Sequence, residues 1–312
     1  MYQGCKNEHG GSKGMRESTR RVIKMHGVRL DRALHHYIYF KFYDVYIKYF
    51  YLAAKLALPW ISSLKVTSLA LQGVFERFHA RVLAPQEFNR ILSLHEDVSL
   101  DTRTAKQVVP FTYAYDVILE NPEFIAAIDC PCRKTFGKDT DDMTVCICVG
   151  TGALFWLEQG QRQHSKRIDQ SEALDIIRRQ RAKGCITTAW FKVATGGRSG
   201  VICSCHPDYC VGLQGMRMAK NLAYAEGVTN HAPSGYTIAI DSARCINCGM
   251  CVDACHFNAL TATSVPPAYQ REACLGCGLC AEACPERAIT MLNDPKRPPA
   301  LDRELDRACR IT

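Results

Sequence analysis

Aromatic and charged positions in the first third of the chain follow a helical period. Between residues 37 and 51, nine of fifteen residues are aromatic, and no glycine or proline interrupts the run before Pro59. At about 100° per residue, the charged side chains of this stretch fall on one narrow stripe of the cylinder. They are Lys41, Asp44, Lys48 and Lys55. The pattern predicts one amphipathic helix over residues 37–58 that has to be covered on most of its circumference.

Two kinds of cover suit such a helix. Its four charges argue against a transmembrane span, because each is costly at the centre of a bilayer. The helix therefore either packs in the core of its own domain or docks on a membrane interface or a partner subunit, where tyrosine side chains are favoured.

Proline positions predict further helices in this part of the chain. Pro85 and Pro110 stand where first helical turns begin, and the second helix is expected to run to Leu119. The N-terminal third is therefore predicted to be mainly helical.

The hydrophobic period changes in the middle of the chain. Short apolar or β-branched runs at residues 124–129, 144–149 and 185–191 predict strands. Between the last two, Asp169 begins a capping box and Gly184 follows a basic last turn, which predicts a helix. We therefore expect an α+β fold with a small α/β module at residues 121–230.

Cysteine usage is the unusual feature of the composition. The chain has 312 residues, 47% apolar and 22% charged, which is enough to bury cores and excludes wholesale disorder. It also has 18 cysteines, many in C-x-C and C-x2-C pairs too close for routine disulfides. Metal ligation in a reducing compartment fits this usage, so we expect a cytoplasmic protein. Arg20-Arg21 precedes Arg29, Asp31 and Arg32 instead of an apolar segment, so no export signal is expected.

Charge is unevenly distributed along the chain. Residues 1–36 hold eight Lys/Arg against three Asp/Glu, whereas residues 236–294 hold three Arg against six Asp/Glu. The first stretch predicts a basic tail, and no recognition fold accompanies it, so no nucleic-acid partner is expected. The predicted organisation is a flexible tail at 1–30, a mainly helical region at 31–120, the cysteine-rich module at 121–230, an acidic domain at 236–294 and a tail at 295–312.

The acidic domain contains an internal repeat with a 29-residue offset. Its first run has cysteines at 245, 248, 251 and 255, and its second at 274, 277, 280 and 284. The C-x2-C-x2-C spacing lets a tight loop wrap three thiolates around one iron–sulfur cube, and the glycines in the loop allow close approach of the backbone. The fourth ligand has to come from elsewhere. Two structural zinc knuckles are the alternative, but four thiolates in two pairs would suffice for zinc.

At these residues the sequence closely resembles the bacterial-type two-cluster ferredoxins, in which the fourth cysteine of each run ligates the other cluster. The resemblance implies two [4Fe-4S] clusters, one held by Cys245, Cys248, Cys251 and Cys284 and one by Cys274, Cys277, Cys280 and Cys255. Residues 237–240 and 288–291 match the short strands that close such a fold. His256 stands where this family usually has a proline.

The middle module carries a second set of cysteines whose spacing matches no standard ferredoxin. Pairs of the C-x-C type can offer two thiolates to one metal, because residues i and i+2 of a strand share a face. We predict at least one additional [4Fe-4S] cluster, with zinc or buried redox-active thiols as alternatives. The favoured ligands are Cys130, Cys132, Cys203 and Cys205, at the ends of neighbouring strands, and the substitutes are Cys146, Cys148 and Cys210.

Two residues beside these pairs are candidates for tuning such a cluster. Arg133 and His206 directly follow C-x-C pairs and could donate hydrogen bonds to cluster sulfur. Solvent exposure is the alternative for Arg133. The cysteine pattern loosely resembles an upstream region of ferredoxin-like subunits of anaerobic oxidoreductases.

The predicted function is single-electron transfer through iron–sulfur clusters. A free ferredoxin needs only the last 60 or so residues, so the remainder favours a subunit that docks on redox partner proteins in a larger oxidoreductase. The alternatives are an enzyme whose catalytic metal site lies in the middle module, and a scaffold with structural zinc there. Membrane association would come through the residue 37–58 helix or through a partner.

Overall fold

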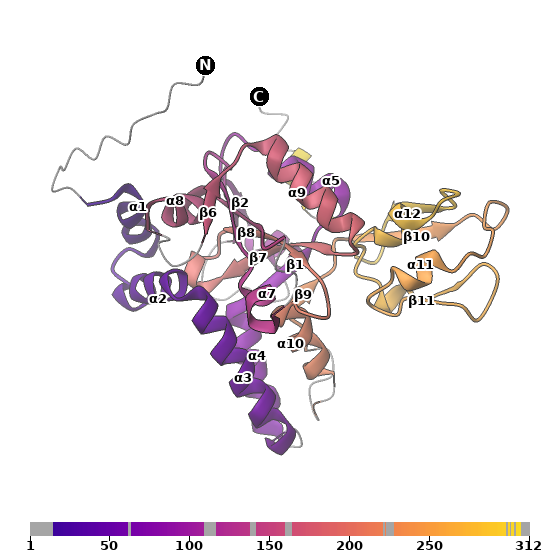
Figure 1. Cartoon of the computed structure of the whole chain (residues 1–312), viewed down its shortest axis with the longest axis horizontal. Coiled ribbons are helices and arrows are strands. Elements are labelled where there is room, and N and C mark those ends of the chain that lie inside the picture. The colour runs from indigo at the N-terminus through magenta and orange to yellow at the C-terminus, as the bar shows by residue number, and fades with distance from the viewer. Residues whose placement is uncertain are drawn as a thin grey trace.

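The computed structural model describes residues 15–61, 64–108, 117–137, 142–159, 164–220, 222, 228–297, 299, 301–302 and 304–306. It has an α+β architecture with a central sheet, helices around it and a separate C-terminal lobe (Figure 1). Residues expected in the flexible N-terminal tail form helix α1 (Glu17–His26), in which Ser18 and Val22 are buried. Likewise, Leu301 and Leu305 of the expected C-terminal tail are fully buried.

The aromatic run forms two helices, whereas the sequence predicted one. Helix α2 (Leu30–Lys41) ends at Phe42, where the backbone leaves helical geometry, and α3 (Tyr43–Ile61) then runs through Pro59. Tyr39 and Phe40 of α2 are buried beneath the body of the molecule, but the far half of α3 is not covered. Helix α4 (Lys65–Arg77) follows, and α3 and α4 extend together away from the sheet (Figure 1).

Seven of the described strands form the central sheet in the order β6-β4-β5-β8-β7-β1-β9. They are β1 (Phe78–Val82), β4 (Ile125–Asp129), β5 (Thr144–Val149), β6 (Ser165–Arg167), β7 (Ile186–Lys192), β8 (Val201–Cys205) and β9 (His231–Ala232). Only the β1–β9 pair is parallel. Strand β1 comes from the region predicted to be mainly helical, so the sheet spans the expected boundary at residue 120. The division into five segments stays a prediction.

Helices cover both the sheet and its ends. They are α5 (Pro85–Ile91), α6 (Thr102–Val108), α7 (Pro131–Phe136), α8 (Gly150–Gln159), α9 (Gln170–Ala182), α10 (Val211–Ala219) and the 3-10 turn η1 (Val193–Thr195). Asp169 caps α9 as predicted, because its side chain accepts a hydrogen bond from the backbone of Glu172 at 2.8 Å. Residues 117–119 form strand β3 (Val117–Leu119), paired with β2 (Val98–Leu100), so the helix expected to reach Leu119 does not do so. Residues 109–116 lie outside the described part.

The C-terminal lobe, residues 236–294, projects from one side of the body (Figure 1). Strands β10 (Tyr236–Ile240) and β13 (Ile289–Asn293) pair antiparallel and close it, in agreement with the sequence prediction. Between them lie α11 (Met250–Asp253), β11 (Leu260–Thr261), β12 (Ala268–Tyr269), η2 (Arg271–Ala273) and α12 (Leu279–Ala283). In the part of the chain that is described, no helix combines the length and apolar character needed to cross a membrane.

Candidate metal centres

The two cysteine runs of the lobe adopt matching local conformations. In each run the third cysteine lies in a short helix, α11 or α12, that starts after a left-handed glycine, Gly249 or Gly278. One residue before the second cysteine, Asn247 and Gly276 also have positive φ angles. At Gly276 a side chain is excluded, because a Cβ atom would approach Ser234 Oγ to 2.3 Å and Tyr236 O to 2.4 Å. The repeat in sequence is therefore a repeat in backbone shape.

One group of lobe cysteines, which we call the outer group, consists of Cys245, Cys248, Cys251 and Cys284. These four residues line one cavity of about 20 Å³. Cys248 is exposed to solvent. Cys284 Sγ also accepts a hydrogen bond from the backbone N–H of Ala288 at 3.2 Å. The outer group has the composition that the resemblance implies for the first cluster, including the crossed cysteine from the second run.

The remaining lobe cysteines form the inner group, Cys255, Cys274, Cys277 and Cys280. Burial, with a smaller contribution from the nearby Cys274 and Cys255 thiols, raises the pKa of Cys277 to about 11. Backbone N–H groups of Ala259 and Gly276 donate to Cys255 Sγ and Cys274 Sγ, each at 3.3 Å. Cys255 and Cys284, the fourth cysteines of the two runs, thus each accept a hydrogen bond from the backbone N–H of the residue four positions later. Such bonds stabilise thiolate and tune the potential of a bound cluster.

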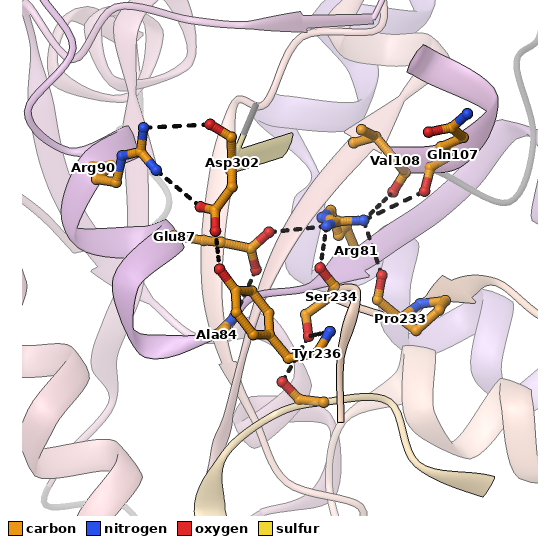
Figure 2. A network of polar contacts seen from close by, with 11 residues as sticks. Arg81, Ala84, Glu87, Arg90, Gln107, Val108, Pro233, Ser234, Tyr236 and Asp302 are labelled. Atoms are coloured by element: carbon orange, nitrogen blue, oxygen red, sulfur yellow. Dashed lines mark hydrogen bonds and ion pairs between the residues drawn. The ribbon is translucent and has the colours of Figure 1, made fainter. Parts of the chain in front are cut away.

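A buried polar network anchors the chain that enters the lobe (Figure 2). Arg81 pairs with Glu87 at 2.9 Å, and both side chains are almost completely buried. Arg81 also donates to the backbone oxygens of Pro233, at 2.9 Å, and Ser234. On the lobe side, Ser234 Oγ donates to Gly276 O at 2.7 Å. The body therefore holds both the linker and the inner cysteine loop through Ser234.

A second ionic contact fixes the inner group against the body. Arg181 of α9 donates to Cys277 O at 2.8 Å and pairs with Glu282 at 2.9 Å. The Arg181 side chain is only 3% exposed. Leu275 and Cys277 pack against the main hydrophobic core, whereas Cys251 belongs to a small separate core within the lobe. Cys277 of the inner group therefore faces the body of the protein, whereas Cys255 and Cys280 pack against the lobe's own core.

His256, the departure from the ferredoxin pattern, makes a contact with the middle module. Its Nε2 lies 2.6 Å from Gly184 O, which makes Nε2 the protonated nitrogen. Its ring meets the ring of His206 edge to face, with centroids 4.8 Å apart. His256 directly follows Cys255 and His206 directly follows Cys205. The two histidines thus join the inner group to the cysteines of the middle module.

Six cysteines of the middle module line one cavity, and the thiol of each shifts the pKa of its two neighbours around a closed ring, which we call the thiol ring. In order around the ring they are Cys130, Cys132, Cys210, Cys205, Cys203 and Cys146. The Cys203 and Cys146 sulfur atoms are 4.0 Å apart. Cys130 and Cys132 flank the start of α7, Cys146 lies on β5, Cys203 and Cys205 on β8, and Cys210 caps α10.

The sequence-based account of these cysteines needs three corrections. Strands β4 and β8 are not neighbours, because β5 lies between them and brings Cys146 into the ring. Cys130 directly follows strand β4, as expected, but Cys132 lies in the first turn of α7, so the pair does not share the face of a strand. Cys148 lies outside the ring, although it shares β5 with Cys146, and burial raises the pKa of its thiol to about 12. The order of the strands in the sheet and the position of Cys210 at the start of α10 decide which thiols meet. The spacing of the cysteines in the sequence predicts neither of them.

Arg133 is fully buried, so the exposed alternative for this residue is wrong. It donates to Tyr209 Oη at 3.1 Å and lies 3.9 Å from the sulfur of Cys185. Tyr209 also stacks on His206, with ring centroids 5.3 Å apart. Arg133 therefore supports the loop that carries His206.

A buried cation lies beside the thiol ring, and sequence analysis did not single it out. Lys192 is 3% exposed and donates to Tyr39 Oη at 2.5 Å and Tyr43 Oη at 3.2 Å. Among the described residues it has no carboxylate partner. Burial lowers the Lys192 pKa, and nearby thiols, Cys203 first, oppose that shift. Within the ring, hydrogen bonds with Cys146 and Cys205 lower the pKa of Cys203 to about 7. The environment therefore stabilises negative charge on the sulfur of Cys203, whereas the pKa values of four other ring thiols are raised: Cys132, Cys146, Cys205 and Cys210.

Comparison with known proteins identifies part of the chain. Residues 238–291 match the 4Fe-4S dicluster domain family, and the matched segment contains all eight lobe cysteines. A search of curated proteins finds no match. Among the described residues, no group of three or more His, Cys, Asp or Glu side chains is placed so that it could hold a metal ion. The family match supports [4Fe-4S] binding by an iron–sulfur domain of ferredoxin type, and with it a role in electron transfer.

Proposed function

We propose that this protein transfers single electrons between a partner bound at the C-terminal lobe and a further iron–sulfur cluster in the thiol ring. In this proposal the outer and inner groups each hold one [4Fe-4S] cluster, and the ring holds a third. When bound, clusters of this kind accept and release one electron each without breaking bonds to substrate. The single observation that carries the proposal is the His206–His256 contact between the inner group and the ring.

The chain's own residues support a fixed relative position of the three cysteine groups. Arg181 and the Arg81–Glu87 network attach the lobe at two places, and both arginines are buried. A buried ion pair that also bonds backbone carbonyls holds its neighbours in one geometry. Fixed separation suits electron transfer, because no docking step is then needed inside the molecule.

Electrostatics supports binding of an anionic group in the ring. A four-iron cluster with four thiolates carries about −2 when oxidised. Lys192 places a positive charge beside the ring, and four aromatic rings shield it from water: Tyr39, Tyr43, Phe78 and Trp190. A buried lysine without a carboxylate partner favours an anion close by.

The lobe's surface supports a subunit role in a larger oxidoreductase. Cys248 is exposed and belongs to neither hydrophobic core. The lobe segment is acidic, with six Asp/Glu against three Arg in residues 236–294. An acidic surface around an exposed cluster steers a basic redox partner. The free thiols favour a reducing compartment such as the cytoplasm.

Iron and sulfide analysis of anaerobically reconstituted protein tests this function. We expect about twelve iron and twelve sulfide per chain, whereas two clusters would give about eight of each. The triple variant Cys130→Ser/Cys132→Ser/Cys203→Ser should fall to about eight, because it leaves three ring thiols and a four-iron cluster needs four. The matched control Cys148→Ser removes a buried thiol outside the ring and should stay near twelve. A wild-type protein that saturates near eight, with no zinc, contradicts the third cluster and leaves the lobe assignment intact.

A catalytic centre in the middle module is the second candidate function. One observation favours it: all six ring cysteines also line the larger of two cavities described in this structure. A cluster with access to a cavity can exchange electrons with a small molecule as well as with a protein.

A further inference from the structure

Helices α3 and α4 expose large apolar side chains where they extend away from the sheet (Figure 1). We call this part, residues 48–61 of α3 and 64–70 of α4, the outer hairpin. On α3, Tyr49 is 66%, Leu56 71% and Trp60 87% exposed. On α4, Val66 is 65% and Leu69 58% exposed. Soluble monomers rarely gather so many apolar side chains in one exposed place, so this surface calls for something that covers it.

The exposed apolar side chains of α3 form one continuous stripe. Its members recur at intervals of three or four residues, and all of them are exposed: Tyr49, Leu52, Leu56 and Trp60. At about 100° per residue they share one face of the helix, within an arc of about 80°. Ile47, on the opposite face, is buried in the main core. The stripe therefore points away from the body of the protein.

The charge of the outer hairpin has a single sign. Between Asp44 and Glu76 the sequence contains three lysines and no arginine, aspartate or glutamate. The lysines are Lys48, Lys55 and Lys65, and all three are exposed. Lys48 and Lys55 are seven residues apart, so they lie on the same edge of the stripe. An apolar stripe with lysines along its edge is complementary to a membrane surface that contains anionic lipids.

Lysine and aromatic residues favour a membrane over a protein as the cover. Lysine is depleted at protein–protein interfaces, whereas the polar face of an interfacial helix is rich in it. Tyr49 begins the stripe and Trp60 ends it, and side chains of both types concentrate at the level of lipid headgroups. Trp60 is also the exposed one of the chain's three tryptophans, because Trp156 and Trp190 are buried. It can therefore report on contact with lipid.

We propose that the outer hairpin docks on the surface of a membrane that contains anionic lipids, with the stripe of α3 at the level of the headgroups. An amphipathic helix of this kind lies in the interface and buries only its apolar face. The C-terminal lobe projects from a different side of the body (Figure 1), so the outer group stays free for a redox partner while the hairpin is docked. The inference goes beyond the proposed electron-transfer function and does not depend on the number of clusters.

Co-sedimentation of the full-length reconstituted protein with lipid vesicles tests the proposal. Vesicles of phosphatidylcholine and phosphatidylserine in equal parts should bind it, and vesicles of phosphatidylcholine alone should bind it more weakly. Lys48→Gln/Lys55→Gln/Lys65→Gln should weaken binding to the mixed vesicles by roughly a hundredfold, about fivefold for each lysine. The matched control removes three exposed lysines from other elements and should leave binding unchanged. These lysines are Lys24, Lys106 and Lys166.

A second pair of variants tests the apolar stripe. Leu56→Ser/Trp60→Ser should weaken binding to the mixed vesicles by roughly tenfold or more. Leu30→Ser/Leu34→Ser is the control, because both leucines are exposed on α2. All four side chains are exposed, so the variants should keep the urea midpoint of the wild-type protein, which separates loss of binding from unfolding.

Fluorescence quenching shows whether the stripe touches lipid. Brominated phosphatidylcholine in the mixed vesicles should quench the tryptophan fluorescence of the bound protein. Trp60→Phe keeps an aromatic side chain in the stripe, so it should still bind but lose this quenching. Quenching that persists in Trp60→Phe places another part of the protein in the lipid and contradicts the proposal.

Three further results overturn the membrane surface. They are failure of the wild-type protein to bind the mixed vesicles, equal loss in hairpin and control variants, and self-association through the stripe without vesicle binding, which light scattering would detect. Iron content measured on the same samples separates the two proposals. About twelve iron without vesicle binding keeps the electron-transfer function, and hairpin-dependent binding with about eight iron keeps the membrane surface but not the third cluster.

Discussion

The two cysteine-rich regions of this protein assemble their thiols in opposite ways. In the lobe, two short loops of the same shape each supply three cysteines, and one cysteine from each run crosses to the other group. In the middle module, six thiols arrive from two strands, a helix start and a helix cap spread over 81 residue positions, from Cys130 to Cys210. Local geometry builds the first site, and tertiary packing builds the second. The lobe should therefore depend on individual cysteines, and the ring on the stability of the whole body.

Loss of one crossed cysteine should have the largest effect. Cys284→Ala removes a thiol from the cavity lined by Cys245, Cys248 and Cys251, so the cluster of the outer group should be lost with about four iron. Electron paramagnetic resonance of the reduced protein, together with iron analysis, follows each cluster. Loss of the inner-group signal with retention of the outer one contradicts the crossed ligand sets.

Breaking the buried anchor of the lobe should have the next largest effect. Arg81→Met leaves Glu87 buried without its cation, which costs about 3 to 5 kcal/mol in the free energy of unfolding. Urea unfolding followed by circular dichroism measures it. Arg20→Met is the control, because the exposed Arg20–Glu17 pair contributes no more than about 1 kcal/mol. An Arg81→Met variant as stable as the control would show that the network does not hold the lobe.

Replacement of His256 should have a smaller effect. His256→Pro restores the usual ferredoxin residue but removes the bond to Gly184 O and the ring contact with His206. One lost hydrogen bond costs about 1 kcal/mol, so the fold should survive. Electron equilibration between lobe and ring should slow, as measured by rapid-mixing absorbance after reduction of the lobe. His206→Phe keeps an aromatic ring at the contact and should equilibrate faster than His256→Pro. Equal rates for all three proteins would exclude the contact as the connection.

The sequence predicted the lobe better than the ring for a physical reason. Spacing within a run specifies a loop, so the repeat predicted that three cysteines of each run meet, and the resemblance to two-cluster ferredoxins supplied the crossed fourth ligand and the closing strands. Ring membership depends on strand order, and nothing local indicates that β5 separates β4 from β8. Cys210 meets the ring only because it caps α10. In the sequence Lys192 is likewise an ordinary strand residue. Only the fold shows that Tyr39 and Tyr43 bury it beside the ring.

The aromatic run shows the same limit. No glycine or proline marks a break at Phe42, yet the helix ends there. On either side of the break, α2 packs beside η1 and α8, and α3 packs beside α7. Two packing partners in different directions override a continuous helical pattern. The sequence did not predict that the outer half of α3 is exposed. An amphipathic pattern predicts that a helix face is covered, but it does not identify what covers that face.

The number of electrons that one chain accepts tests most directly whether both regions hold clusters. In an anaerobic dithionite titration followed by absorbance, the reconstituted protein should take up about three electrons per chain, one for each four-iron cluster. The triple variant Cys130→Ser/Cys132→Ser/Cys203→Ser, which keeps too few ring thiols for a cluster, should take up about two, and Cys148→Ser about three. Uptake of about two electrons by the wild-type protein, with no change in the ring variant, would contradict the proposed cluster in the thiol ring.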